Sequence, residues 1–188
     1  MARGMHFIAR IPPMMMNTLI AGTGGLGINI AYLLLKRGDS VVVTTRSLEK
    51  GARIEKELSS FGKICNIAVD PSTDQGVNEM FEKASAQFGK VDNLIVTVGG
   101  YASDSIENPA HLNEMLESHL TIPLNMLKHF PKFAISKGSV VLISSIQSIY
   151  TSNWNLTSYI LGKNSLNKLV ELAAAQLLNK DIRVNAVA

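Results

Sequence analysis

Residues 18–46 read TLIAGTGGLGINIAYLLLKRGDSVVVTTR and set the architecture of the chain. A β-branched, apolar start leads into a glycine-rich turn, residues 22–27, and a stretch with helical spacing follows from about residue 26 to residue 37 (26–37). Gly38 then suits a left-handed helix C-cap, and a second β-branched run occupies residues 41–45. Strand, glycine turn, helix and strand in this order predict a βαβ unit with a parallel sheet.

The same alternation continues to the end of the chain. Six apolar runs are nearly continuous, as expected of strands buried on both faces. They cover residues 18–21, 41–45, 64–69, 94–98, 140–143 and 182–187. Five helical stretches lie between them: 26–37, 47–60 (capped by Ser47), a third that starts after Ser72 with Gln75 at capping-box spacing, a fourth that begins at Asn108-Pro109, and 155–179. We therefore expect an α/β, doubly wound parallel sheet of about six strands, a three-layer α/β/α Rossmann fold.

Length and composition are those of one packed domain. The chain has 188 residues, of which 46% are hydrophobic and 18% charged, and no apolar run reaches the ~18–20 residues that span a bilayer. The net charge is +3, and the lysines and arginines are interleaved with acidic residues rather than gathered in a basic stripe or a polybasic patch. We therefore expect neither nucleic acid nor membrane as a partner. We assign residues 14–188 to a single domain and residues 1–13 to a loosely ordered N-terminal extension.

Cysteine and histidine positions bear on compartment and metals. Cys65 is the only cysteine, which excludes an internal disulfide and predicts an intracellular, cytoplasmic protein. It lies in an apolar run, so buried packing is favoured over a reactive thiol. The histidines lack partners at metal-ligand spacing, so no metal site is expected; they are His6, His111, His119 and His129.

The glycine turn is the first candidate site. Its residues are Gly22, Thr23, Gly24, Gly25, Leu26 and Gly27. Glycine permits the positive φ of a tight turn and lets a pyrophosphate approach the backbone, while the N-terminus of the following helix attracts anions. The position between strand and helix predicts a dinucleotide site. A methyltransferase and a plain structural turn share the pattern and remain as alternatives.

The end of the second strand bears on which dinucleotide binds. NAD sites place an acid about 20 residues after the glycine turn, where it holds the ribose diol. Here the strand ends Thr44-Thr45-Arg46-Ser47, without an acid. Arg46 can stack on adenine and pair with a 2′-phosphate. NADP (NADPH) is therefore favoured over NAD, and a solvated loop arginine is the alternative interpretation.

Tyr159 and Lys163 form the second candidate site. Their i, i+4 spacing puts both side chains on one helix face. An ammonium group beside a phenol stabilises the phenolate, so a tyrosine in this setting can pass a proton to or from an alcohol oxygen. A YxxxK pair also arises by chance, but this one follows the fifth strand, whose end carries Ser144-Ser145. A methyltransferase has no need of such a pair.

The glycine turn, the two serines and the YxxxK pair, in this order, resemble the short-chain dehydrogenase/reductase family. The resemblance covers about residues 14–188, and 3-oxoacyl-acyl-carrier-protein reductases are among the most similar members. It implies that Ser145 hydrogen-bonds the substrate oxygen, that Tyr159 is the general acid/base, and that Lys163 also binds the nicotinamide ribose. With the glycine turn, the further cofactor contacts that we expect come from Arg46, Ser47, Asp70, Gly99 and Gly100.

Four departures from the family pattern bear on activity. The glycine turn is one residue shorter than usual, and Ala21 stands where the family has a threonine. Thr97 and Val98 replace two asparagines, so the hydrogen bonds that brace the central strands must be made otherwise. His119 stands at the asparagine that supports a proton relay to the lysine, where an imidazole either serves as a fourth catalytic residue or is merely accommodated. The chain stops at Ala188, before the family's Pro-Gly turn, last strand and last helix.

The chain end leads to further expectations. The sixth strand is left as an apolar edge, which either another chain covers or a longer protein completes. One substrate wall is missing, and the remaining substrate surface is expected from Tyr101, Ser145, Gln147, Tyr150 and Trp154. The sequence predicts an NADP-dependent oxidoreductase acting on a small-molecule carbonyl or secondary alcohol. The alternative is a non-catalytic dinucleotide-binding protein or an inactive truncated remnant.

Two helical stretches, about 108–133 and 155–179, carry more leucines than a sheet-facing side needs. These leucines are Leu116, Leu120, Leu124, Leu127, Leu166, Leu169, Leu172 and Leu177. In the family, helices at these positions form a dimer interface as a four-helix bundle. We therefore expect a homodimer, and the alternative is that these helices only cover the sheet.

Overall fold

The computed structural model describes residues 15–188, so the predicted extension, residues 1–13, lies outside the described residues. Six parallel strands form one sheet in the order β3-β2-β1-β4-β5-β6. The strands are β1 (Asn17–Ala21), β2 (Ser40–Thr45), β3 (Ile64–Ala68), β4 (Val91–Val96), β5 (Ala134–Ile143) and β6 (Arg183–Val187). The strand order reverses between β1 and β4, and this confirms the predicted doubly wound fold.

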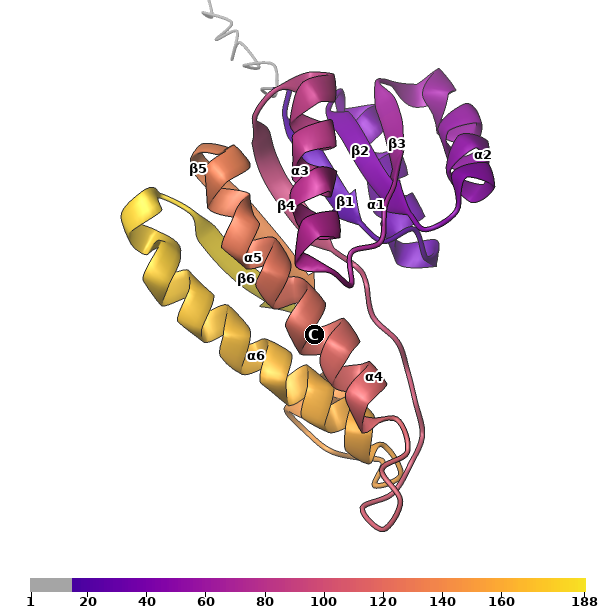
Figure 1. The fold of residues 1–188 in the computed structure, drawn as a ribbon, viewed down its shortest axis with the longest axis vertical. Coiled ribbons are helices and arrows are strands. Elements are labelled where there is room, and N and C mark those ends of the chain that lie inside the picture. The colour runs from indigo at the N-terminus through magenta and orange to yellow at the C-terminus, as the bar shows by residue number, and fades with distance from the viewer. Residues whose placement is uncertain (1–14) are drawn as a thin grey trace, which may run out of the picture.

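Helices cover both faces of the sheet (Figure 1). On one face lie α1 (Gly25–Arg37) and α2 (Leu48–Leu58). On the other face lie α3 (Asp74–Phe88), α4 (Leu112–Leu116), α5 (Ile122–Phe133) and α6 (Thr157–Leu177). A π-helical turn, Glu117–Thr121, joins α4 to α5. The alternation of β1 shows the two layers, because Leu19 packs into the α3–α5–α6 core while Ile20 packs into the α1–α2 core.

Two predicted caps are present. Gly38 has a φ of 101° and ends α1, and its N–H bonds the carbonyls of the last turn. Ser47 caps α2, since its side chain accepts a hydrogen bond from the Lys50 N–H. The predicted cap of α3 was wrong by one residue: Thr73, rather than Ser72, accepts from the Gly76 N–H, at 3.0 Å.

Several element bounds differ from the prediction. The helix expected from Asn108-Pro109 begins at Leu112, because the backbone turns at residues 108–111 and the His111 N–H donates to the Asp104 carboxylate at 3.1 Å. Strand β4 ends at Val96, since the next residue turns to bind the glycine loop. Strand β5 begins six residues earlier than expected. The prediction missed this first half because it is largely polar and lacks the apolar pattern of a buried strand.

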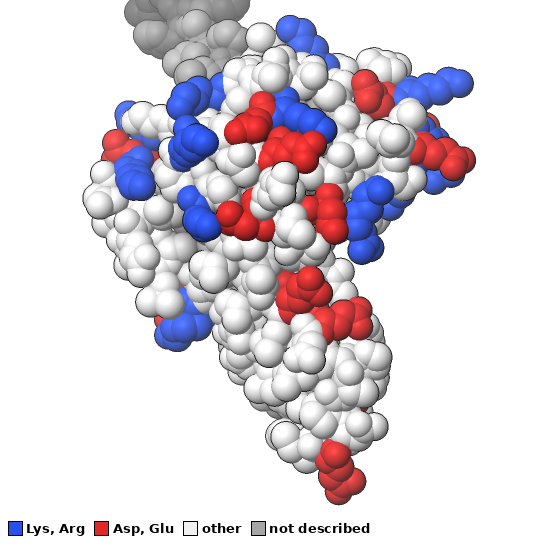
Figure 2. Space-filling model, viewed as in Figure 1, with Lys and Arg blue, Asp and Glu red and all other residues white. Residues whose placement is uncertain are grey.

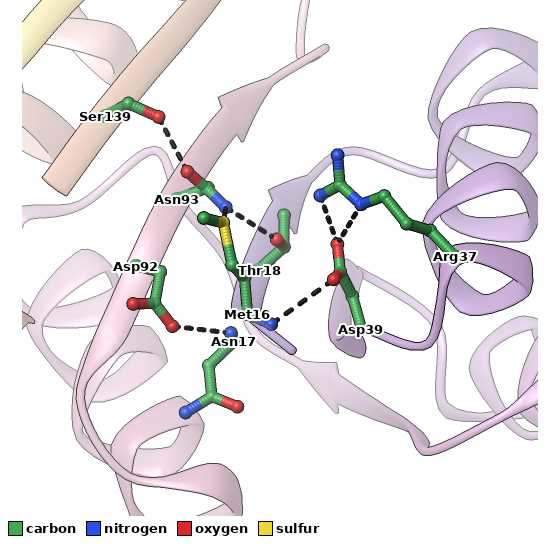
Figure 3. A network of polar contacts seen from close by, with 8 residues as sticks. All are labelled: Met16, Asn17, Thr18, Arg37, Asp39, Asp92, Asn93 and Ser139. Atoms are coloured by element: carbon green, nitrogen blue, oxygen red, sulfur yellow. Dashed lines mark hydrogen bonds and ion pairs between the residues drawn. The ribbon is translucent and has the colours of Figure 1, made fainter. Parts of the chain in front are cut away.

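Polar contacts fasten the amino ends of the strands, opposite the carboxyl ends that carry the site (Figure 3). The buried Asp39 accepts from the Met16 N–H at 3.2 Å and from Arg37 Nε at 3.1 Å. The Asn17 N–H donates to Asp92 Oδ2 at 2.7 Å, which joins β1 to β4. At the same end of the sheet Asn93 of β4 links β1 to β5, because its side chain donates to Thr18 and accepts from Ser139. Strand β1 is therefore held on both sides before it enters the glycine turn.

Most leucines expected at a helix interface pack inward instead. Leu127, Leu166 and Leu169 are buried in the core of the α3–α5–α6 face. Leu124 and Leu172 are 47% and 51% exposed. The buried leucines therefore cover the sheet, as the alternative interpretation states. The exposed pair, Leu124 and Leu172, is what remains on the surface for the predicted interface.

No helix within residues 15–188 is long and apolar enough to cross a membrane. Over the same residues, no group of three or more His, Cys, Asp or Glu side chains is placed to hold a metal ion. Cys65 is half-buried rather than fully buried, and its burial raises the pKa of the thiol. A raised pKa leaves less reactive thiolate, which agrees with a packing role.

Candidate active site

The glycine turn closes against the end of β4. Gly22 has a φ of 108°, and a Cβ there would lie 2.7 Å from Thr97 Oγ1. A Cβ on Gly27 would lie 2.2 Å from the Gly22 carbonyl oxygen. The Thr97 hydroxyl donates to the carbonyl oxygens of Ala21 and Gly22, at 3.2 Å and 3.0 Å. Thr97 therefore makes the brace between β1 and β4 that the missing asparagines leave open.

A cavity of about 700 Å³ opens beside this turn at the carboxyl ends of β1, β2 and β4. Its walls include most of the predicted cofactor residues: Gly22, Thr23, Gly24, Arg46, Ser47, Asp70, Gly99 and Gly100. Gly25, Leu26 and Gly27 are not among its wall residues, because they form the first turn of α1. A Cβ built on Gly24 or Gly25 meets nothing within 4 Å, so the loop leaves open space in front of the helix N-terminus.

The β2 end of the cavity is basic. Arg46 directly follows β2, and Lys50 lies in the first turn of α2; both are exposed and line the cavity. Asp70 lies on the same wall, where the Ser72 N–H donates to its Oδ1 at 3.0 Å. This bond, with a smaller contribution from the Arg46 charge, holds the pKa of Asp70 below its usual range. A carboxylate and two cations therefore share this end of the cavity.

These features fit a nicotinamide dinucleotide. The first turn of α1 contains no acid, and its N–H groups suit a pyrophosphate. Arg46 and Lys50 supply positive charge for a further phosphate at the β2 end. At the opposite end the cavity reaches Gly99 and Gly100, beside Glu114. The donor set is thus arranged for a long, phosphorylated ligand rather than a compact one.

Tyr159 and Lys163 lie one turn apart on α6, as their spacing predicts. Lys163 Nζ lies 5.8 Å from the centre of the Tyr159 ring and donates to the Ile143 carbonyl oxygen at 2.7 Å. Burial lowers the pKa of Lys163 to about 8. The ring of Tyr101 also packs on Tyr159, with its centroid 5.1 Å from that of Tyr159. The tyrosine therefore contacts an aromatic ring from one loop and lies near a buried cation from its own helix.

His119 completes this cluster. It is 1% exposed, lies in the π-helical turn and meets the Tyr159 ring edge-to-face at 5.6 Å. Its Nε2 lies 3.1 Å from the Gly100 carbonyl oxygen, which assigns the ring proton to Nε2. Burial, and secondly the charge of Lys163, lower the pKa of His119 to about 4. The imidazole is therefore neutral near pH 7, with Nδ1 as an acceptor.

Two glycines make room for this imidazole. A Cβ on Gly99 would lie 2.8 Å from His119 Cε1, and a Cβ on Gly162 would lie 3.0 Å from His119 Cδ2. The same Gly162 position lies 2.9 Å from the Met115 carbonyl oxygen, so α6 also packs closely on α4 there. His119 thus occupies a closely fitting socket formed with Gly99 and Gly162. A histidine that was only accommodated would not need two glycines against its ring.

Ser145 is placed by its neighbours at the end of β5. Its Oγ accepts from the Gln147 N–H at 3.3 Å, and its carbonyl oxygen accepts from Ser148 Oγ at 2.6 Å. Asn167 of α6 donates to that same Ser148 hydroxyl at 2.8 Å, so the serine loop is fastened to the helix that carries Tyr159. Ser144 is buried and bonds Asn167 directly, which makes it the structural member of the serine pair.

The substrate surface expected around this cluster is exposed and apolar. Tyr101, Tyr150 and Trp154 are 66%, 73% and 81% exposed, and Ser145 and Gln147 are half-buried. Sequence reasoning did not identify Lys50 in the cofactor cavity or Gly162 in the imidazole socket. A lysine four residues after Arg46 was a signal for the first, but no local pattern reveals the second.

Comparison with known proteins gives the family. The short chain dehydrogenase family profile matches residues 17–188. The chain is 27% identical over 179 residues to the 7alpha-hydroxysteroid dehydrogenase of Escherichia coli (strain K12), covering 90% of this chain and 68% of that protein. Among solved structures, a short-chain type dehydrogenase/reductase from Mycobacterium ulcerans superposes with a TM-score of 0.83 at 24% identity, covering 90% of this chain and 65% of that one.

An NAD⁺-bound xylitol dehydrogenase superposes with a TM-score of 0.84 at 22% identity, over 91% of this chain and 68% of that one. This chain therefore spans about two thirds of the length of the proteins it resembles. At these identities the solved structures establish the fold, and the profile match over nearly the whole chain establishes the relationship. The chain belongs to the short-chain dehydrogenase family.

Proposed function

We propose that this protein is an NADPH-dependent oxidoreductase that interconverts a carbonyl compound and a secondary alcohol. The observation that carries the proposal is the position of Gly99 between the dinucleotide cavity and the side chains of His119 and Lys163. This residue lines the dinucleotide cavity, and a Cβ on it would lie 3.8 Å from Lys163 Nζ. The cavity that fits the dinucleotide therefore reaches a residue that neighbours His119 and Lys163, although Tyr159, Lys163 and His119 are not themselves among its wall residues. When bound, the nicotinamide supplies the hydride.

The chain's own residues handle the proton and the substrate oxygen. Ser145 and the Tyr159 hydroxyl hydrogen-bond the oxygen, and Tyr159 gives its proton to the forming alkoxide or accepts it in the reverse direction. The Lys163 ammonium stabilises the phenolate that remains. Lys163 would also bind the nicotinamide ribose, and its Nζ is held in place by the Ile143 carbonyl oxygen.

His119 has a defined place in this scheme. Because Nε2–H is committed to the Gly100 carbonyl, Nδ1 is the atom that can accept a hydrogen bond from a water that also contacts Lys163. A neutral imidazole adds no positive charge beside the lysine, unlike a protonated one. His119 then supports reprotonation of Lys163 after each turnover.

The preference for NADPH rests on Arg46 and Lys50. Both line the β2 end of the cavity, where they would hold the 2′-phosphate of a bound NADPH, and no acid at the end of β2 is available for a ribose diol. Asp70, on the same wall, would contact the adenine. Charge-assisted bonds from two cations favour the phosphorylated cofactor.

The protein is further proposed to act on a 3-oxoacyl compound and to form homodimers. The side chains of Tyr101, Tyr150 and Trp154 are exposed aromatic rings, of which Tyr101 packs on Tyr159, and aromatic surface of this kind suits an acyl chain. The exposed Leu124 and Leu172 on α5 and α6 support helix pairing between two copies. A monomer in sedimentation at micromolar concentration would count against the dimer.

Replacement of Tyr159 by phenylalanine tests the reaction. The Tyr159→Phe variant keeps the ring that packs on Tyr101 and His119 but loses the proton donor. We expect carbonyl reduction, followed as NADPH consumption, to fall by about 10²–10⁴-fold while NADPH binding, followed by nicotinamide fluorescence, stays within twofold. Turnover that survives this change would refute the role of Tyr159, and NADPH binding by wild-type protein without turnover of any carbonyl would favour the non-catalytic alternative.

A further inference from the structure

Helix α6, which carries Tyr159 and Lys163, begins without a cap of its own. Its N-cap residue is Leu156, whose side chain cannot accept a hydrogen bond, and its first turn contains no acid. The first N–H groups of a helix need acceptors, and a serine, threonine, aspartate or asparagine at the N-cap ordinarily supplies one. The acceptor for this helix must therefore come from elsewhere in the chain.

Asp104 supplies it from 54 residues earlier in the sequence. Its Oδ1 accepts from the Ser158 N–H at 2.9 Å, and its Oδ2 accepts from the Ser158 hydroxyl at 2.5 Å. Ser158 is fully buried, whereas Asp104 is only half-buried, so the carboxylate reaches Ser158 from the surface of the molecule. The hydrogen bonds from Ser158 hold the pKa of Asp104 below its usual range.

The backbone at Asp104 reinforces the same contact. Its N–H donates to the Asn155 carbonyl oxygen at 3.0 Å, and its own carbonyl oxygen accepts from the Thr157 N–H at 3.3 Å. These bonds form a short parallel bridge between Asp104 and Leu156. The segment thus binds both the last residues before α6 and its first turn.

The same carboxylate also closes its own loop. Asp104 Oδ2 accepts from the His111 N–H at 3.1 Å, which fixes the segment between β4 and α4. Tyr101 lies three residues before Asp104 and packs against the Tyr159 ring at 5.1 Å. One side chain therefore joins the loop that carries Tyr101 to the helix turn that carries Tyr159, and in Figure 1 this loop and the start of α6 meet at the lower end of the molecule.

We propose that Asp104 is a positioning residue, which sets the orientation of Tyr159 for proton transfer by capping α6 from the loop between β4 and α4. Asp104 binds Ser158, the residue before Tyr159, and it is not among the residues that line the dinucleotide cavity. The inference rests on the proposed function. Small errors in the orientation of a reacting group lower kcat strongly, whereas the binding of a distant cofactor is unaffected.

The test compares Asp104→Ala with the conservative Asp104→Asn. Asparagine keeps one oxygen for the Ser158 N–H, and its amide can donate to the Ser158 hydroxyl. Only the bond from the His111 N–H is lost, so most of the cap should be restored. We expect Asp104→Ala to lower kcat about tenfold or more at a temperature well below unfolding, with NADPH affinity within twofold of wild type, and Asp104→Asn to return kcat to within about threefold. Glu107→Ala, an exposed acid of the same loop, is the matched control and should leave kcat unchanged.

Amide hydrogen exchange gives a readout that needs no activity. In Asp104→Ala the amides of residues 157–160 should exchange faster, while the later turns of α6 keep their protection, and Asp104→Asn should restore the slow rates. An active wild type whose kcat is unchanged by Asp104→Ala would overturn the inference. So would a loss of kcat, NADPH affinity and melting temperature together in both Asp104 variants, because that pattern is general unfolding. An inactive wild type whose exchange responds to Asp104→Ala would instead overturn the proposed function.

Discussion

The glycine turn and the His119 socket both depend on glycine, but for opposite reasons. At the turn, the missing Cβ atoms make room for backbone: a Cβ on Gly27 would lie 2.2 Å from the Gly22 carbonyl oxygen. At the socket, the missing Cβ of Gly99 makes room for a side chain, because its nearest neighbours are the His119 ring and Lys163. A backbone clash cannot be relieved by a second substitution, whereas a side-chain clash can.

The largest effect is expected at the glycine turn. Gly27→Ala should lower the free energy of unfolding by about 3 kcal/mol and remove measurable NADPH binding, because the new methyl group must displace the Gly22 carbonyl. Gly24→Ala is the matched control, since a Cβ there meets nothing within 4 Å. It should leave the denaturation midpoint unchanged and weaken only NADPH binding, where the pyrophosphate approaches the backbone. Equal loss of stability in both variants would contradict this assignment.

An effect of similar size on stability is expected when the pH is lowered, because of the buried His119. The pKa of His119 is lowered to about 4 in the folded protein, while in the unfolded chain it is about 6.5. Below pH 6.5 the unfolded chain takes up a proton that the folded protein refuses, so stability falls as the pH drops toward 4, by up to about 3 kcal/mol. Urea denaturation of wild type and His119→Asn between pH 7 and pH 4 measures this. The two proteins should differ in acid sensitivity, and parallel curves would refute a neutral buried His119.

A double-mutant cycle on the socket should give a smaller number. Gly99→Ala alone should cost about 1–3 kcal/mol of stability, because the methyl group meets His119 Cε1 at 2.8 Å. In a His119→Asn background the shorter side chain leaves space, and the cost of Gly99→Ala should fall by at least about 1 kcal/mol. Additive effects would show that the imidazole does not set the requirement for glycine. The same cycle with Gly27→Ala should be additive, as the comparison requires.

The smallest effect is expected from the difference in charge between the cofactor end and the substrate end of the site. The loops around Tyr159, residues 99–111 and 144–156, contain two acids and no lysine or arginine, and on the face drawn in Figure 2 their end of the molecule shows no blue. A neutral N-acetylcysteamine 3-oxoacyl thioester should therefore be reduced with kcat/KM about tenfold above that of the matching CoA thioester at low salt. The gap should close as salt is added. A CoA thioester that reacts equally well at low salt would contradict this view of the substrate end.

The comparison also shows what sequence patterns can and cannot reach. Glycine turn, strand order and the Tyr159–Lys163 pair follow from local periodicity and spacing, and so the fold and the cofactor cavity were predicted in outline. Gly162, Asp104 and the brace made by Thr97 depend on which distant segments pack together, and no local pattern encodes that. The misplaced start of α4 has the same origin, because the bond from His111 to Asp104 overrides the Asn108-Pro109 helix signal.

The roles of the cavity residues are tested most directly by titrating the wild-type chain with NADPH and with NADH while following nicotinamide fluorescence. We predict saturable binding of NADPH at least about tenfold tighter than that of NADH, because Arg46 and Lys50 line the cavity and no acid ends β2. Arg46→Asp should reverse or abolish this preference. Equal affinity for both cofactors, or binding of neither, would contradict the account of an NADPH site at the glycine turn.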